Sequence, residues 1–140
     1  MQILYTAEAL ANGDGRNGHA RTTDGKIDVE LSAPKELGGN GEGTNPEQLF
    51  AAGYAACFHS ALRLVGKQAK ANIDDSAVGA KVGIGPNGGG GFGLAVTLEI
   101  SLPHLSREDA QAIADKAHLV CPYSNATRGN IDVQLVVADD

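Results

Sequence analysis

Two cysteines, Cys57 and Cys121, are the side chains in this sequence best suited to covalent or redox chemistry. In a reducing compartment, a pair so far apart along the chain is not expected to form a permanent disulfide. Three alternatives remain: two unrelated core thiols, a redox pair, or half of a metal site. Free cysteine is among the most buried residue types, so frequency alone favours core thiols.

The two thiols have different sequence surroundings. Cys57 lies in the small, apolar stretch AAGYAACFHS, and apolar surroundings raise the pKa of a thiol. A reactive Cys57 therefore needs a cation from another segment, and Arg16, in the turn-rich segment NGDGRNGH, is the best candidate. Cys121 precedes a proline and could be the N-cap of a short helix, which would lower its pKa. The alternative is a turn in which Cys121 only packs.

A metal site has to be weighed against the redox pair. Cys57 and His59 form a C-x-H motif, and His118 and Cys121 form H-x2-C, which together could supply four zinc ligands. The C-x-H half is poorly spaced, because side chains two positions apart on a helix diverge by about 200°. We therefore expect no metal.

The composition excludes several classes of protein. The chain has 140 residues, a net charge of −6, 42% hydrophobic residues and no tryptophan. An acidic chain is a poor partner for nucleic acid or for an anionic membrane surface. No apolar stretch approaches the roughly 20 residues of a membrane span, and the N-terminus does not read as a signal peptide. We expect one soluble, cytoplasmic domain covering residues 1–140, with a core of Ala, Val, Leu and Ile.

The first half of the sequence predicts strands followed by a long helix. Apolar residues alternate over 3–9 and over 27–31, as in half-buried strands. A helix is expected from near residue 46 to about Lys70, starting at either a Thr44–Glu47 capping box or an Asn45 cap. Residues 49–58 are small or apolar on every side of this helix. Such a helix is buried all round, so we expect part of its burial to come from another subunit.

The second half predicts two strands, a helix and a last strand. Residues 77–85 and 92–102 read as strands joined by PNGGGG, a flexible hairpin turn rather than a phosphate loop, since no Lys-Ser/Thr follows it. Ser106 caps a helix that ends near His118, and residues 131–137 alternate as a strand. The order βββ-α-ββ-α-β defines an α+β fold.

Two segments of the sequence carry a family resemblance. The stretches TNPEQLFAAGYAACFHSALR and HLVCPYSNATRGNIDV closely resemble the organic hydroperoxide resistance (Ohr) branch of the OsmC/Ohr family, and GDGRNG fits that family's N-terminal arginine segment. The similarity spans essentially the whole chain. It implies an antiparallel sheet wrapped on a buried central helix, in an intertwined homodimer with active sites at the subunit interface.

The same resemblance implies a function. The family's members are cysteine-based peroxidases that reduce organic hydroperoxides, fatty-acid hydroperoxides among them, to alcohols in defence against oxidative stress. By the family pattern Cys57 is the peroxidatic cysteine, Cys121 is the resolving cysteine that forms a disulfide with it, and Arg16 and Glu47 assist the thiol. The usual reductant is a dihydrolipoyl group on a lipoylated protein, and no cofactor is bound. A redox-sensing or ligand-binding protein whose cysteines do not turn over is the alternative.

Two expectations concern the geometry of this site. Ten residues of helix separate Glu47 from Cys57 by about 15 Å along the axis, so Arg16 could hardly touch both. Either the helix breaks near Gly53, which we favour, or one group belongs to the partner subunit. We also expect apolar side chains to line a pocket for the tail of the peroxide, although each of them alone is more often a core residue: Leu49, Phe50, Tyr54, Phe58 and Phe92.

Overall fold

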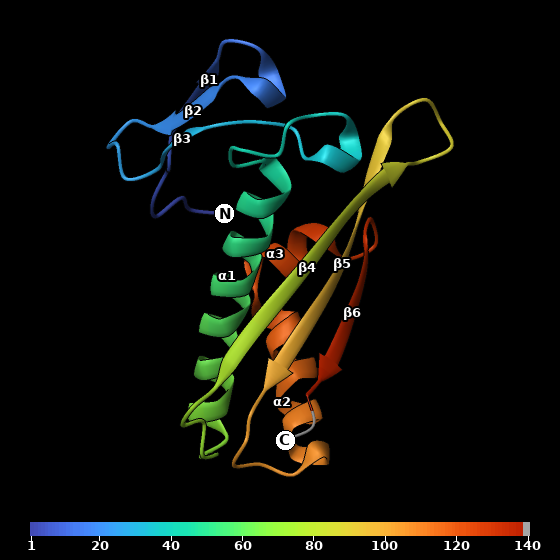
Figure 1. Cartoon of the computed structure of the whole chain (residues 1–140). Helices are drawn as coiled ribbons and strands as arrows, with labels where there is room; N and C mark the ends of the chain where they lie inside the picture. The colour runs from blue at the N-terminus through green and yellow to red at the C-terminus, as the bar shows by residue number, and fades with distance from the viewer. Residues whose placement is uncertain (139–140) are drawn as a thin grey trace. The chain divides into compact units, whose positions relative to one another are not determined.

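Two three-stranded sheets, each built from its own part of the chain, organise the structure (Figure 1). The structure, a computed structural model, describes residues 1–138. The chain forms two units, Met1–Leu49 and Phe50–Asp140.

The first unit contains an antiparallel sheet of three short strands in the order β1-β2-β3: β1 (Ala9–Asn12), β2 (His19–Thr22) and β3 (Asp28–Glu30). The strand predicted from residue 3 onward is wrong in position, because residues 1–8 have no regular secondary structure. The reason is the length of the partner strand. β2 ends at Thr22, and the hydrogen bond from the Thr23 N–H to the Glu8 carbonyl is the last rung beside β1.

The long helix α1 (Pro46–Gln68) begins one residue later than the Thr44–Glu47 capping box would place it. The Asn45 side chain accepts a hydrogen bond from the Gln48 N–H at 2.8 Å, and the Gln48 side chain accepts one from the Asn45 N–H at 3.1 Å. This reciprocal pair satisfies two N–H groups at the helix start. The predicted Asn45 cap is confirmed, and Glu47 takes no part in capping.

The break predicted near Gly53 is wrong, because α1 continues without interruption through this position. Gly53 serves packing instead of bending. A Cβ atom at residue 53 would lie 3.1 Å from the Tyr123 hydroxyl oxygen, closer than ordinary van der Waals contact. The missing side chain therefore lets the Tyr123 ring lie against the helix.

The second unit contains a mixed sheet in the order β4-β5-β6, formed by β4 (Ala77–Pro86), β5 (Phe92–Ser101) and β6 (Asp132–Val137). The first two strands form the predicted antiparallel hairpin, whereas β6 pairs parallel to β5. The expectation of an antiparallel sheet is thus wrong for this strand. The chain crosses between β5 and β6 through α2 (Arg107–Val120) and α3 (Pro122–Thr127), and such a helical crossover permits parallel pairing.

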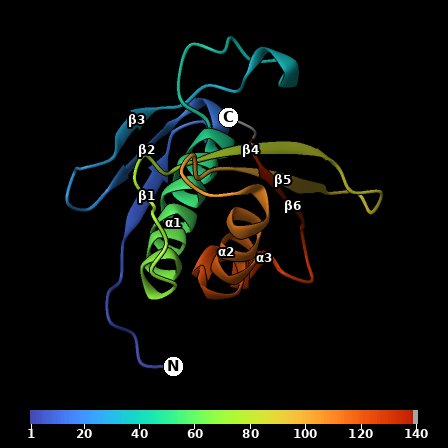
Figure 2. The same cartoon turned by 90° about the horizontal axis from the view of Figure 1, so that it is seen from below.

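The core of the second unit lies between this sheet and its helices, which occupy one face of the sheet (Figure 2). The predicted order of elements is confirmed, with α3 as an additional six-residue helix. Aliphatic side chains of β5 belong to the same buried cluster as side chains of α1 and α2, as expected for a chain without tryptophan. The fully buried core side chains include Tyr54, Phe58, Leu62, Leu98, Ile100, Ala114 and Ala117.

On length and composition alone, α1 could cross a membrane, with a mean hydropathy of 1.2 over an 18-residue window. The expectation that no stretch reached this length was therefore too strict. Core helices pass the same criteria, and the second half of α1 is packed into the core of the second unit through Ala61, Leu62 and Val65. Hydropathy alone is thus weak evidence for a membrane here.

The two glycines of α1 should respond differently to substitution by alanine. A Cβ at Gly66 would collide with the buried Ile73 side chain, so we expect Gly66→Ala to destabilise the protein by roughly 1–3 kcal/mol. At Gly53 the partially exposed Tyr123 ring can yield, and the better helix propensity of alanine offsets the tight contact. Urea unfolding of both variants would test this ranking, and a Gly66→Ala variant as stable as Gly53→Ala would contradict it.

Candidate active site

The two cysteines meet in the second unit. Cys57 lies on α1, Cys121 lies at the junction of α2 and α3, and their sulfur atoms are 3.5 Å apart. Both are free thiols, and Cys121 is buried whereas Cys57 is partly accessible. A disulfide has its sulfurs about 2.05 Å apart, so a small movement would join the pair. Of the three alternatives left open for these cysteines, the geometry fits the redox pair.

A sharp turn between two helices fixes the position of Cys121. Its N–H donates to the Ala117 carbonyl at the end of α2, and its carbonyl accepts from the Asn125 N–H inside α3, both at 2.9 Å. Pro122 follows in the first position of α3, where the missing N–H of proline does no harm. The predicted N-cap position of Cys121 is confirmed, although its side chain does not cap the helix.

The backbone N–H of Tyr123, in the first turn of α3, donates a hydrogen bond to the Cys57 sulfur. This bond acts to lower the pKa of Cys57, but burial of the thiol and the neighbouring Cys121 act in the other direction. Burial is the largest of these influences, and the pKa of Cys57 is raised overall. None of the three influences is a cation, so a stable thiolate requires a positive charge in addition to them.

The predicted pair of Arg16 and Glu47 is present in the first unit. Arg16 Nη1 donates to Glu47 Oε2 at 3.0 Å, and Nη2 makes an ionic contact of 2.9 Å with Oε1, which lacks hydrogen-bond geometry. The Glu47 hydrogen bond raises the pKa of Arg16, which keeps the guanidinium charged. The Arg16 side chain remains 42% exposed while Glu47 is 14% exposed, so the cation is held in place and still accessible.

Local structure explains how this arginine reaches α1. Arg16 lies in a 3-10 turn, Gly15–Asn17, and the Asn17 side chain accepts a hydrogen bond from the Ala33 N–H at 3.0 Å. A bridge between Leu31 and Thr44 then brings the start of α1 beside the strands of the same unit. The turn location predicted for Arg16 is confirmed.

The five side chains expected to line a substrate pocket are dispersed. Phe50 lines a cavity of about 360 Å³ together with Tyr123, Ala126, Thr127 and Ile131. Tyr54 and Phe58 are fully buried core residues instead of pocket walls. Phe92 is 72% exposed at the start of β5, and Leu49 is the last residue of the first unit.

Sequence reasoning missed the residues of α3 and the loop after it that line this cavity. Their signal was the apolar and aromatic spacing that follows Cys121 in CPYSNATRGNI. The rings of Phe50, Tyr54 and Tyr123 form a cluster with centroid separations of 5.7–6.2 Å. The lining of this cavity thus comes from α1, α3 and the loop after α3.

The four residues considered as zinc ligands do not converge. The His59 ring bonds the Ser76 hydroxyl at 2.9 Å, and the His118 ring bonds the Ser124 hydroxyl at 2.8 Å. Within residues 1–138, no three potential ligands from His, Cys, Asp and Glu lie together. The histidines are therefore used in hydrogen bonding.

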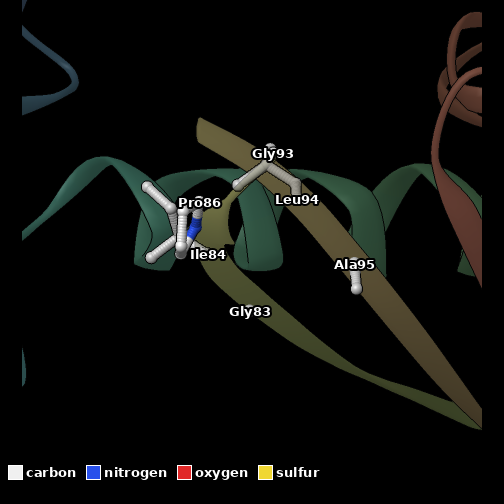
Figure 3. A pocket seen from close by; sticks show the side chains of 7 residues that line it. Gly83, Ile84, Pro86, Gly93, Leu94 and Ala95 are labelled. Atoms are coloured by element: carbon white, nitrogen blue, oxygen red, sulfur yellow. The ribbon is translucent and has the colours of Figure 1, made fainter. Parts of the chain in front are cut away.

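A second hollow, of about 440 Å³, lies on the β4–β5 hairpin (Figure 3). Its lining consists of small and aliphatic residues: Gly83, Ile84, Gly85, Pro86, Gly93, Leu94 and Ala95. None of these side chains can donate a proton or act as a nucleophile. This hollow therefore offers no catalytic group, in contrast to the surroundings of the cysteine pair.

The chain has an α+β fold that brings two free thiols face to face, and comparison with known proteins identifies its family. Residues 39–136 match the family described as OsmC-like protein. The chain belongs to this family, in its organic hydroperoxide resistance branch.

The similarity to members of this branch extends over nearly the whole chain. An organic hydroperoxide resistance protein of Xanthomonas axonopodis pv. citri is 53% identical over 139 residues, which cover 98% of this chain and 96% of that protein. A crystal structure of an organic hydroperoxide resistance protein from Elizabethkingia anophelis is 54% identical with a TM-score of 0.94 and full coverage of both chains. One from Legionella pneumophila is 50% identical with a TM-score of 0.93, covering 99% and 100%.

The 3.5 Å sulfur separation predicts the product of mild oxidation. One equivalent of a thiol oxidant should convert the reduced protein into an intramolecular Cys57–Cys121 disulfide, because no large movement is needed to join the sulfurs. Intact-mass analysis should show the loss of two hydrogen atoms, and a peptide map should show the cross-link. Cys121→Ser is the matched control and should form no internal cross-link; a wild-type protein that yields only intermolecular disulfides would contradict the geometry.

Proposed function

We propose that the protein is a cysteine-based peroxidase that reduces organic hydroperoxides to alcohols. The observation that carries the proposal is the pair of thiols, one partly accessible and one buried, with sulfurs 3.5 Å apart. The names of the relatives, organic hydroperoxide resistance proteins, support the choice of substrate. Defence against oxidative stress is the corresponding cellular role, and we expect it to be exercised in the cytoplasm.

In the first step the Cys57 thiolate attacks the O–O bond of the hydroperoxide. A sulfur–oxygen bond forms as the O–O bond breaks, which leaves Cys57 as a sulfenic acid and releases an alkoxide. The alkoxide takes up a proton and leaves as the alcohol. The partial accessibility of Cys57 suits this role, since a fully buried sulfur could not meet a substrate.

In the second step the Cys121 thiol condenses with the sulfenic acid. The new sulfur–sulfur bond displaces the hydroxyl group, which leaves as water with the thiol proton. A dithiol then restores both cysteines by exchange and is itself oxidised to a disulfide. We propose the dihydrolipoyl group of a lipoylated protein as this reductant, with no cofactor bound to the chain.

Arg16 supplies the positive charge that the thiolate needs. Burial raises the pKa of Cys57, and an arginine next to the sulfur would favour the charged form. Its planar guanidinium can also donate hydrogen bonds to the peroxide oxygens. Glu47 holds this guanidinium through the two contacts already described.

We further propose that the protein is a homodimer in which the Arg16–Glu47 pair of one protomer serves Cys57 of the other. Because α1 is uninterrupted, ten residues of helix keep Glu47 about 15 Å from Cys57 of its own chain along the axis. Of the two arrangements considered from the sequence, the uninterrupted helix favours the shared site. Dimer formation would also cover the apolar residues of α1 that are exposed in a single chain.

The apolar cavity lined by Tyr123, whose backbone N–H bonds the Cys57 sulfur, favours hydroperoxides with a hydrocarbon tail. Phe50, Tyr123 and Ile131 line it, and each methylene buried there would contribute about 0.8 kcal/mol. Hydrogen peroxide has no such group. We therefore expect alkyl and fatty-acid hydroperoxides to be the better substrates.

Replacing the nucleophile tests the proposed reaction. Cys57→Ser should abolish peroxide consumption, because a serine hydroxyl cannot be oxidised to a sulfenate. The wild-type protein should consume many equivalents of cumene hydroperoxide when dihydrolipoamide is supplied. Consumption of a single equivalent would instead indicate a redox sensor, and activity retained in Cys57→Ser would remove Cys57 from the mechanism.

Complementation tests the shared site. In a heterodimer of Arg16→Ala and Cys57→Ser protomers, one site combines the intact Arg16 with the intact Cys57 only if these residues come from different chains. We expect about half of the wild-type activity per dimer, whereas each homodimeric variant should be nearly inactive. An inactive heterodimer would place Arg16 and Cys57 in the same protomer.

A further inference from the structure

Four polar side chains form a buried hydrogen-bond chain beside the cysteines. The Tyr54 hydroxyl lies 2.8 Å from the Ser124 hydroxyl and 3.1 Å from that of Thr127. The Ser124 hydroxyl is also 2.8 Å from Nδ1 of His118. The Thr127 hydroxyl donates to the Ser124 carbonyl at 3.2 Å. These four residues, His118, Ser124, Tyr54 and Thr127, form the hydroxyl network.

The hydroxyl network lies close in sequence to both cysteines, before Cys57 and on both sides of Cys121. Tyr54 precedes Cys57 by three residues on α1, one helical turn away, while His118 and Ser124 lie three residues before and after Cys121. Tyr54, Ser124 and Thr127 are buried, and a buried hydroxyl without a partner destabilises the fold. The network therefore ties the backbone one turn before Cys57, and the backbone on both sides of Cys121, to one cluster.

Counting protons gives the network a direction. A carbonyl can only accept, so the Thr127 proton is committed to the Ser124 carbonyl, and the Thr127 oxygen must accept from Tyr54. Tyr54 has then used its proton and accepts from Ser124. Ser124 in turn has used its proton and accepts from His118. The chain thus runs from His118 Nδ1–H through the three hydroxyls to the carbonyl.

We propose that the hydroxyl network is a positioning device that holds Cys121 opposite Cys57 for disulfide closure, and that it fixes neutral His118 as the Nδ1–H tautomer. The role in disulfide closure rests on the proposed peroxidase function, whereas the assignment of the His118 tautomer does not. The residues of the network act through the backbone of α1, α2 and α3.

Arg128 makes further hydrogen bonds at the junction of α2 and α3. The Arg128 guanidinium donates to the His118 carbonyl and, at 2.8 Å, to the Asn125 side chain. Burial, followed by the charge of Arg128, lowers the pKa of His118. The imidazole is therefore neutral at pH 7.5, where its tautomer can be measured.

Nitrogen NMR of the histidine rings tests the direction of the chain in the reduced protein. Wild-type His118, assigned by loss of its signal in His118→Asn, should be protonated at Nδ1. In Tyr54→Phe the Ser124 proton loses its acceptor and turns to Nδ1, so His118 should switch to the Nε2–H form. Thr127→Val should cause the same switch, because the Tyr54 proton then turns to Ser124.

Tyr5→Phe, at an exposed tyrosine outside the network, is the matched control and should leave His118 unchanged. An Nε2–H tautomer in the wild type, or no switch in either network variant, would overturn the assignment. This measurement needs no peroxide, so it stands if the chain proves to have no peroxidase activity.

Single-turnover kinetics test the positioning role. With a hydroperoxide in stopped flow, Ser124→Ala should form the Cys57 sulfenate within about twofold of the wild-type rate but close the disulfide about fivefold or more slowly. In His118→Asn the side-chain amide keeps an N–H donor near the position of the histidine Nδ1. This variant should close the disulfide at nearly the wild-type rate. His118→Asp, which as a carboxylate can only accept, should be slow.

Wild-type closure rates in both Ser124→Ala and His118→Asp would overturn the positioning role. Equal losses in sulfenate formation and disulfide closure would also contradict it, since they would indicate general damage to the fold. A wild-type protein that forms no sulfenate at all would contradict the proposed function instead.

Discussion

The contact between two uncharged sulfur atoms is the constraint on which the rest of the site depends. Thiols attract each other weakly, so the 3.5 Å approach of Cys57 and Cys121 has to be imposed by the scaffold. Three features impose it: the turn at Pro122, the close packing of Tyr123 on Gly53, and the hydroxyl network that links α1 to both ends of the α2–α3 turn. The last two features depend on packing between segments that are distant in sequence.

The same burial that positions the pair makes its chemistry harder. Removing Cys57 from water favours the neutral thiol, and the single backbone N–H from Tyr123 does not offset this. A nearby cation would reverse the balance, and the first unit carries one that is charged, partly exposed and held by Glu47. The nucleophile and the charge proposed to activate it thus belong to different units of the chain.

Local sequence signals predicted most of the helices and strands. Four features could be predicted because each depends on residues that are neighbours in sequence. These are the Ser106 cap, the Asn45 cap, the β4–β5 hairpin and the alternation of β6. The resemblance of distant segments, not spacing, paired Cys57 with Cys121. What failed depends on tertiary contacts: the parallel pairing of β6, and the straight helix at Gly53, where glycine makes room for a ring. The hydroxyl network could not be predicted either, since the sequence pattern does not distinguish Tyr54 from the apolar residues of the helix.

The start of α1 has a consequence for how tolerant the site is to change. An amide side chain, Gln48, closes the cap, while its neighbour Glu47 carries the charge that holds Arg16. Helix initiation and charge placement are thereby assigned to adjacent side chains instead of one. A substitution at either position would then disturb a single property, so the strength of the Arg16 ion pair and the stability of the helix end can vary independently as the sequence drifts.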